Sequence, residues 1–142
     1  MEHTFEQRVF YADTDAYGVV WHGTYLRWLE MGRVYLCEKL GLNLIELKEN
    51  NIALPVTNIN VRYKASAKLN DDIVIKTKIS KVTPLSVTFE QSILHKLSGQ
   101  TFILANVDIV AIDNNGKLYR RLPDILKNVF ETSLKEADLC NV

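Results

Sequence analysis

Two aspartates and a histidine stand close together near the start of the chain, in a pattern that could act on a carbonyl group. Asp13 and Asp15 fall in a polar stretch, and His22 stands where a long apolar segment begins. A carboxylate can attack a carbonyl carbon or activate a water molecule, and the free N–H groups at a helix start can hold the resulting oxyanion. The segment 11–33, which contains all three residues, is therefore the candidate site.

Both aspartates also have a structural interpretation. An aspartate in a turn commonly accepts hydrogen bonds from nearby backbone amides, and from the residues alone this is the default for Asp15. Asp13 and Asp15 would point to opposite faces if a strand continued through them, so they need not share a proton. We interpret Asp13 as structural, as a turn or cap acceptor.

The elements that must position this stretch begin with one strand and one long helix. The pattern predicts a strand over residues 5–11, a polar turn over 12–18, and a helix from His22 or Gly23 to about Leu40. Gly41 suits the left-handed C-cap of that helix. Because apolar residues occupy most sides of the helix, we expect it to be buried.

A sheet should follow, because the apolar period then changes from helical to twofold. Alternation and turn sequences predict a short helical turn at 44–50, strands near 58–64, 73–80, 85–93 and 102–112, a helix from Pro123 to Leu134, and a loose tail over 135–142. Short connections favour antiparallel pairing, and the run 102–112, apolar on nearly both faces, is expected to be the central strand. The fold class is thus α+β, one domain over 1–142, with an antiparallel sheet wrapped around the long helix.

Composition excludes several functions. The 142 residues carry no net charge, which argues against nucleic acid as the main partner, and 47% are hydrophobic, which is enough for a core. No signal peptide is expected after Met1, and no apolar run is long enough for membrane insertion.

Cys37 and Cys140 do not make a disulfide framework, so we expect a cytoplasmic protein with Cys37 as a core residue. The histidines show no metal-ligand spacing, so no metal is expected.

The order of elements, together with the motif of Asp13, Thr14, Asp15, Gly18, Val19, Val20 and His22 followed by Tyr25, Glu30 and Arg33, resembles the hotdog-fold thioesterases. More narrowly, it is similar to the 4-hydroxybenzoyl-CoA thioesterase family, in the branch of YbgC-like acyl-CoA thioesterases. The resemblance covers roughly residues 4–134, although the later strands match in pattern only.

The resemblance implies roles for the motif residues. It makes Asp15 the catalytic carboxylate and places the amide that polarises the thioester carbonyl near His22. His22 itself could contact the thioester, donate to the leaving thiolate or cap the helix, and these alternatives stay open. We expect the substrate to be bound by Tyr17, Gly18, Val19, Gly23, Tyr25 and Glu30. Glu30 and Arg33 are three residues apart on a helix, so an ion pair with a structural role is the competing interpretation.

A basic cluster on the predicted strands could meet the phosphates of coenzyme A. Its best candidates are Arg62, Lys64 and Lys81, although a solvated sheet face is the default for such residues. The family also implies a homo-oligomer, a dimer or a dimer of dimers (a homotetramer), with active sites at subunit interfaces. An exposed sheet edge would favour the same pairing.

These residues predict hydrolysis of an acyl- or aroyl-CoA thioester to the free acid and CoA, without any cofactor beyond the CoA of the substrate. One alternative is a hotdog hydratase or dehydratase. Hydratases of this fold are typified by an Asp-x-Asn-Pro-x-His pattern, whereas Asp15 and His22 have no Asn-Pro between them, which counts against this alternative. The other is a non-catalytic acyl-CoA-binding protein. Aromatic residues around the motif could line an aryl pocket or belong to the core, so aryl and aliphatic acyl groups both stay open.

Overall fold

The computed structural model describes the backbone of residues 1–140 and the side chains of residues 1–136. Its elements are β1 (Glu2–Arg8), the 3-10 helix η1 (Tyr11–Asp13), α1 (His22–Lys39), α2 (Leu44–Glu49), β2 (Val56–Tyr63), β3 (Asp72–Val82), β4 (Ser86–His95), β5 (Thr101–Val110) and α3 (Asp124–Cys140). The α+β class and the long helix starting at His22 are confirmed.

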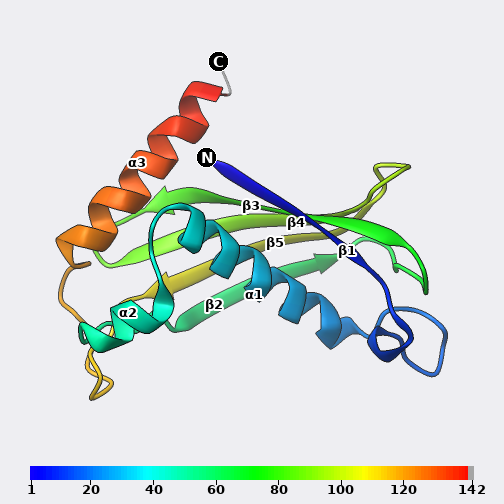
Figure 1. Cartoon of the computed structure of the whole chain (residues 1–142), viewed down its shortest axis with the longest axis horizontal. Helices are drawn as coiled ribbons and strands as arrows, with labels where there is room; N and C mark the ends of the chain where they lie inside the picture. Colours follow the sequence, from blue (N-terminus) through cyan, green and yellow to red (C-terminus); the bar gives the residue numbers. More distant parts are fainter. Residues whose placement is uncertain (141–142) are drawn as a thin grey trace.

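The described strands form one antiparallel sheet in the order β1-β3-β4-β5-β2, and α1 lies across one of its faces (Figure 1). The prediction that the strand at 102–112 is central was wrong, because β4 occupies the middle and β5 lies between β4 and β2. Both strands are interior and rich in apolar residues, so apolar content alone could not order them. The two edges of the sheet are β1 and β2.

The ends of the first strand and of the last helix differ from the prediction. The first strand ends at Arg8 instead of Tyr11, because the Asp13 carboxylate accepts the Phe10 N–H at 2.9 Å and turns the chain into η1. The last helix was expected to end near Leu134, with a loose tail after it, but α3 continues to Cys140; residues 141–142 lie outside the described part.

The end of α1 follows its expected cap. Gly41 has a φ of +87°, which a residue with a side chain rarely adopts, and the Leu42 N–H donates to the Cys37 carbonyl at 2.8 Å. These bonds satisfy carbonyls that the helix end would otherwise leave free. The short helix expected at 44–50 is also present as α2, capped by the Asn43 side chain.

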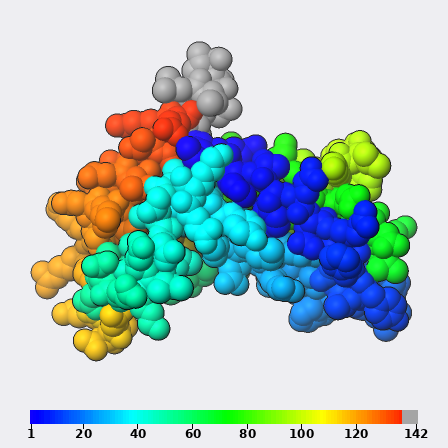
Figure 2. Space-filling model, viewed as in Figure 1, coloured from blue at the N-terminus to red at the C-terminus, as the bar shows by residue number. Residues whose placement is uncertain are grey.

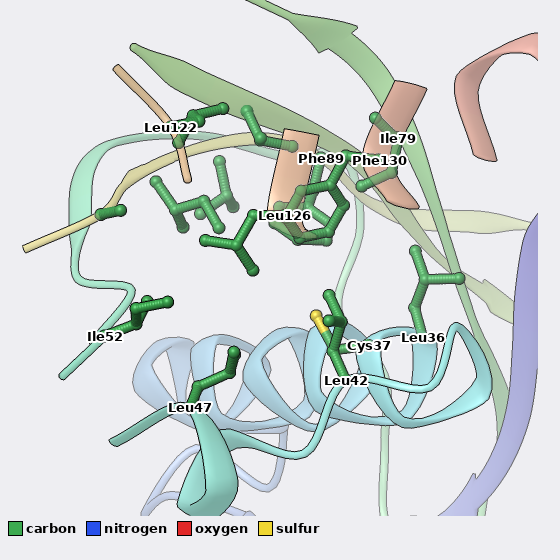
Figure 3. Packing of buried hydrophobic residues seen from close by; sticks show 14 residues of the cluster. Leu36, Cys37, Leu42, Leu47, Ile52, Ile79, Phe89, Leu122, Leu126 and Phe130 are labelled. Atoms are coloured by element: carbon green, nitrogen blue, oxygen red, sulfur yellow. The ribbon is translucent and has the colours of Figure 1, made fainter. Parts of the chain in front are cut away.

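The core consists of two clusters along α1. Around the C-terminal half of α1, Leu36 and Cys37 point toward Phe89 of β4 and Phe130 of α3, whose rings meet edge to face at 6.2 Å (Figure 3). Around the N-terminal half, Tyr25, Trp28 and Leu29 pack on the isoleucines of the sheet. Burial of these side chains holds α1 on the sheet along its whole length.

Between the two clusters, α1 approaches the sheet through Gly32 and a buried polar network. The side-chain amide of Gln91 donates to the Leu29 carbonyl and to the Thr77 hydroxyl, each at 2.8 Å, and Arg33 donates to the Gln91 carbonyl oxygen at 3.0 Å. A Cβ atom at Gly32 would lie 2.4 Å from the Thr77 hydroxyl oxygen. The close approach therefore requires glycine at this position.

The expectation that α1 is buried on most sides is wrong for the single chain. Figure 2 shows α1 at the surface of the viewed face, between β1 and α2. The described chain has only one layer of sheet to cover one side of the helix, so Arg27 and Glu30 are exposed and Leu26 and Tyr35 are each 38% exposed. Among the described residues, no helix is long and apolar enough to cross a membrane.

Candidate active site

Asp15 opens a tight turn that brings the chain back to the start of α1. The Gly18 N–H donates to the Asp15 carbonyl at 3.1 Å, and the Asp15 N–H donates to the Val19 carbonyl at 2.9 Å. Gly18, with a φ of +80°, allows the turn to close. Val20 then bridges Thr14, so Asp15 is held at a fixed place beside the approach to the helix.

The Asp15 carboxylate uses one oxygen locally and leaves the other available. Its Oδ1 accepts the Tyr17 N–H at 2.8 Å, which is the bond that the structural interpretation of this residue expects. Its Oδ2 has no hydrogen-bond partner among the described residues. The bond to Oδ1 thus orients the carboxylate while Oδ2 stays available, so a structural bond and a chemical role are compatible.

Asp13 has the structural role expected of it. It is 9% exposed, and its carboxylate binds the Phe10 N–H within η1. Its backbone carbonyl accepts the Trp21 N–H at 2.9 Å and the Thr24 hydroxyl at 3.2 Å. Asp13 therefore ties the turn to the first residues of α1.

The start of α1 carries free amide groups. The N-cap residue Trp21 makes no side-chain cap, and its carbonyl accepts the Thr24 N–H at 2.9 Å. The N–H groups of His22 and Gly23 have no partner among the described residues, and they stand at the positive end of the helix dipole. Such amides can stabilise an oxyanion.

The Trp21 ring packs on Gly23 at the start of α1. A Cβ atom at Gly23 would lie 2.3 Å from the Trp21 ring, so the ring covers the glycine directly. The Trp21 ring lies 5.0 Å from the His22 ring and is half exposed. An exposed aromatic wall beside free amides suits a flat or acyl-bearing ligand.

The other predicted substrate residues divide between surface and core. A cavity of about 430 Å³ contains Asp15 and is lined by Tyr11, Thr14, Asp15, Ala16, Gly18 and Leu69. Tyr17 is 91% exposed beside it. Tyr25 is buried instead, and its hydroxyl accepts the Ala67 N–H at 2.9 Å. The Val20 N–H donates to the Ala67 carbonyl at 2.9 Å, so Ala67 links the buried Tyr25 hydroxyl to the turn that contains Asp15.

Glu30 lies in a different cavity from Asp15 within the single chain. This second cavity, of about 230 Å³, is lined by Glu30, Arg33, Val34, Cys37, Leu44, Leu54, Val56, Phe89 and Ile109. The ion pair considered for Glu30 and Arg33 is not formed among the described residues, because Arg33 turns inward to Gln91. Burial raises the pKa of the Cys37 thiol to about 12, so this cysteine is a poor nucleophile.

The three predicted phosphate ligands do not form one cluster. Arg62 lies with Lys76 and Lys78 in a groove on the sheet face opposite α1, and Lys64 follows the end of β2. Lys81 pairs with Thr88 near the other end of the sheet. Only Arg62 and Lys64 flank Tyr63, whose hydroxyl donates to the His22 carbonyl at 3.1 Å.

The sequence alone did not predict the contact of Tyr63 with the helix start or the polar network at Gly32. Tyr63 stood at the end of an alternating strand, which signals a face of the sheet but no hydrogen bond. Gln91 and Thr77 occupy inward-facing positions of β4 and β3. A polar residue at such a position must find a buried hydrogen-bond partner, and this pattern could have indicated the network.

Comparisons with known proteins show the family and the fold. Residues 9–131 match the family described as the thioesterase-like superfamily. The acyl-CoA thioesterase YbgC of Haemophilus influenzae is 34% identical over 110 residues, which are 75% of this chain and 81% of the relative.

Two solved structures share the hotdog fold. The probable thioesterase from Bartonella henselae is 34% identical, with a TM-score of 0.79 over 87% of this chain and 100% of its own. The DHNA-CoA thioesterase from Staphylococcus aureus is 26% identical, with a TM-score of 0.84 over 99% of this chain and 93% of its own. On the fold, the motif and these similarities, the chain belongs to the thioesterase-like superfamily.

Proposed function

We propose that this protein hydrolyses acyl- or aroyl-CoA thioesters to the free acid and CoA, with Asp15 as general base or nucleophile. The main support for the proposal is the Asp15 carboxylate, whose Oδ2 has no hydrogen-bond partner among the described residues and whose turn is bonded to the start of α1. The relative in Haemophilus influenzae is named an acyl-CoA thioesterase, and the neighbour in Staphylococcus aureus a DHNA-CoA thioesterase. Both names describe the same bond being broken.

The chemistry follows from the two halves of the site. Either Asp15 attacks the carbonyl carbon, or it removes a proton from a water molecule that attacks. The free amides of His22 and Gly23 stabilise the negative charge that develops on the carbonyl oxygen. The carbon–sulfur bond then breaks, and CoA leaves as the thiolate. If Asp15 was the nucleophile, a water molecule must next hydrolyse the acyl–aspartyl anhydride to release the acid and restore the carboxylate; if Asp15 was the base, the attacking water gives the acid directly. The His22 side chain, exposed at the helix start, stands where it can meet the substrate.

The active unit is proposed to be a homodimer joined through β2, the edge strand whose last residue, Tyr63, bonds to the helix start. Val56, Ile59 and Tyr63 are each more than 40% exposed along this edge, although the register places them on the face that carries α1. Antiparallel pairing of two β2 strands brings the Tyr63 end of one copy to the Val56 end of the other. The Asp15 turn of one copy would then face the Glu30 cavity of its partner.

The assembly should be measurable in solution. Light scattering at micromolar concentration should give a dimer, or a tetramer built from two dimers. Ile59→Asp places a charge on the pairing edge and should give an inactive or weakly active monomer, because the site would lose its second half. Leu97→Asp puts the same charge on an exposed hairpin residue and should change neither property. A wild-type monomer with full activity would contradict the proposed dimer.

The CoA phosphates are proposed to meet Arg62 and Lys64, the basic residues on either side of Tyr63. Neutralising both as Gln should raise the KM for CoA thioesters by roughly 10-fold and leave the KM for thioesters without the nucleotide nearly unchanged. Lys117→Gln, in a turn remote from Asp15, is the matched control. An equal effect on both substrate types would assign Arg62 and Lys64 to the solvated face.

The positions of the aromatic residues bear on which acyl group the site would accept. Trp28 and Tyr25 are core residues, whereas Tyr11, Tyr17 and Trp21 are more than half exposed around the turn. These three rings favour an aromatic or otherwise flat acyl group without excluding an aliphatic one. The buried free thiol of Cys37 fits a reducing compartment, and we propose the cytoplasm.

A further inference from the structure

Tyr63, the last residue of β2, reaches the start of α1 with its hydroxyl group. The hydroxyl donates to the His22 carbonyl at 3.1 Å. The register of β2 on β5 pairs Tyr63 with Ile103, on the face of the sheet that carries α1. The Tyr63 ring meets the buried Tyr25 ring edge to face at 5.9 Å, so the ring is supported from the helix side.

The carbonyl that Tyr63 binds belongs to the same peptide group as the Gly23 N–H. This peptide is trans, as are all the described peptide bonds, so its carbonyl and N–H point in opposite directions within one rigid plane. A hydrogen bond to the carbonyl therefore fixes the direction of the N–H. It also draws electron density toward the oxygen, which makes the N–H a stronger donor.

The neighbouring peptide is held in a similar way. The Trp21 carbonyl accepts the Thr24 N–H at 2.9 Å, which orients the His22 N–H. The Trp21 ring lies over Gly23 and leaves no room for a Cβ atom there. The helix start thus presents two amides whose carbonyl ends are both engaged. The His22 carbonyl belongs to the first turn of α1 and so also takes part in the helix ladder, and the Tyr63 hydroxyl is an additional donor to it from the sheet.

We propose that Tyr63 is a positioning residue for the reaction, and that its hydroxyl orients and polarises the Gly23 amide toward the thioester carbonyl oxygen. This inference rests on the proposed thioester hydrolysis. It gives β2 a second role, because the strand that we propose for dimerisation also holds the helix start. Tyr63 itself does not touch the reacting atoms.

Tyr63→Phe tests the inference because it removes only the hydroxyl. The kcat should fall roughly 3- to 10-fold, the range of one hydrogen bond, with little change in KM. Tyr119→Phe is the matched control, because Tyr119 also donates to a backbone carbonyl, that of Asn51 at 2.6 Å, in a turn remote from α1's start. The control should keep its kcat. Light scattering and thermal melting should show the same assembly and a similar midpoint for both variants.

A spectroscopic reading separates polarisation from a merely structural effect. In the Asp15→Asn background, a bound thioester with an isotope-labelled carbonyl should show a lowered stretching frequency, and adding Tyr63→Phe should move it back toward the value in solution. Three results would overturn the inference: an unchanged stretching frequency, a wild-type kcat in Tyr63→Phe, or loss of the dimer in Tyr63→Phe. None of them would contradict the proposed thioester hydrolysis. A wild-type enzyme that releases no thiol from any thioester would overturn the proposed function, and this inference with it.

Discussion

Asp15→Asn should lower kcat by roughly 100-fold or more, the scale of a lost general base. The substitution removes the charge and the basicity but keeps an Oδ1 that can still accept the Tyr17 N–H, so the turn should persist. Thermal melting should therefore give a midpoint close to that of the wild type. The affinity for a non-hydrolysable thioester analogue should change little, because the loss lies in the transition state.

Asp13→Ala is the internal control for this experiment. It removes the acceptor of the Phe10 N–H, which should cost about 1–2 kcal/mol of the free energy of unfolding. Its effect on kcat should be secondary and should follow the loss of the folded turn. Near wild-type turnover in Asp15→Asn with a large loss in Asp13→Ala would mean that the other carboxylate is the reactive one.

Gly32→Ala should give the largest loss of stability among conservative substitutions in α1. The new methyl group would overlap the Thr77 hydroxyl oxygen and press on the Gln91 amide, so α1 must move away from the sheet or the network must break. Overpacking and a broken buried hydrogen bond together should cost about 2–4 kcal/mol, which exceeds the roughly 1 kcal/mol that alanine contributes to helix propensity. Denaturant titration measures the difference.

A double variant checks that the overlap with Thr77 is the cause. Thr77→Ala removes the hydroxyl that the new methyl group meets, while Gln91 keeps its bond to the Leu29 carbonyl. The double variant should therefore lose less stability than the sum of the two single losses. Strict additivity would show that Gly32 is needed for another reason.

The parts of the fold that local sequence encodes were predicted well. The bounds of α1 followed from an apolar run that starts at His22 and ends before Gly41, whose positive φ the structure contains. Three of the four later strands followed from twofold alternation between turn sequences, and β5 followed from a run that is apolar on nearly both faces. Asp13 and Asp15 could be located from their place in a polar turn, and the resemblance supplied the role of Asp15, which stays a prediction.

The parts that depend on long-range packing were missed. The order of β4 and β5 depends on pairing partners, which apolar content does not name. The exposure of α1 depends on how many layers one chain can supply. The Tyr63 bond to His22 joins residues 41 positions apart, and the division of the predicted site between two cavities appears only when the chain is folded.

Thioester hydrolysis at Asp15 can be measured as thiol release from a panel of aryl and aliphatic acyl-CoA thioesters, with the acid product identified by mass spectrometry. We expect multiple turnovers by the wild-type protein, with equal amounts of free acid and CoA, and loss of that turnover in Asp15→Asn. Binding of the thioesters without thiol release, or conversion of the acyl group with the thioester left intact, would contradict it.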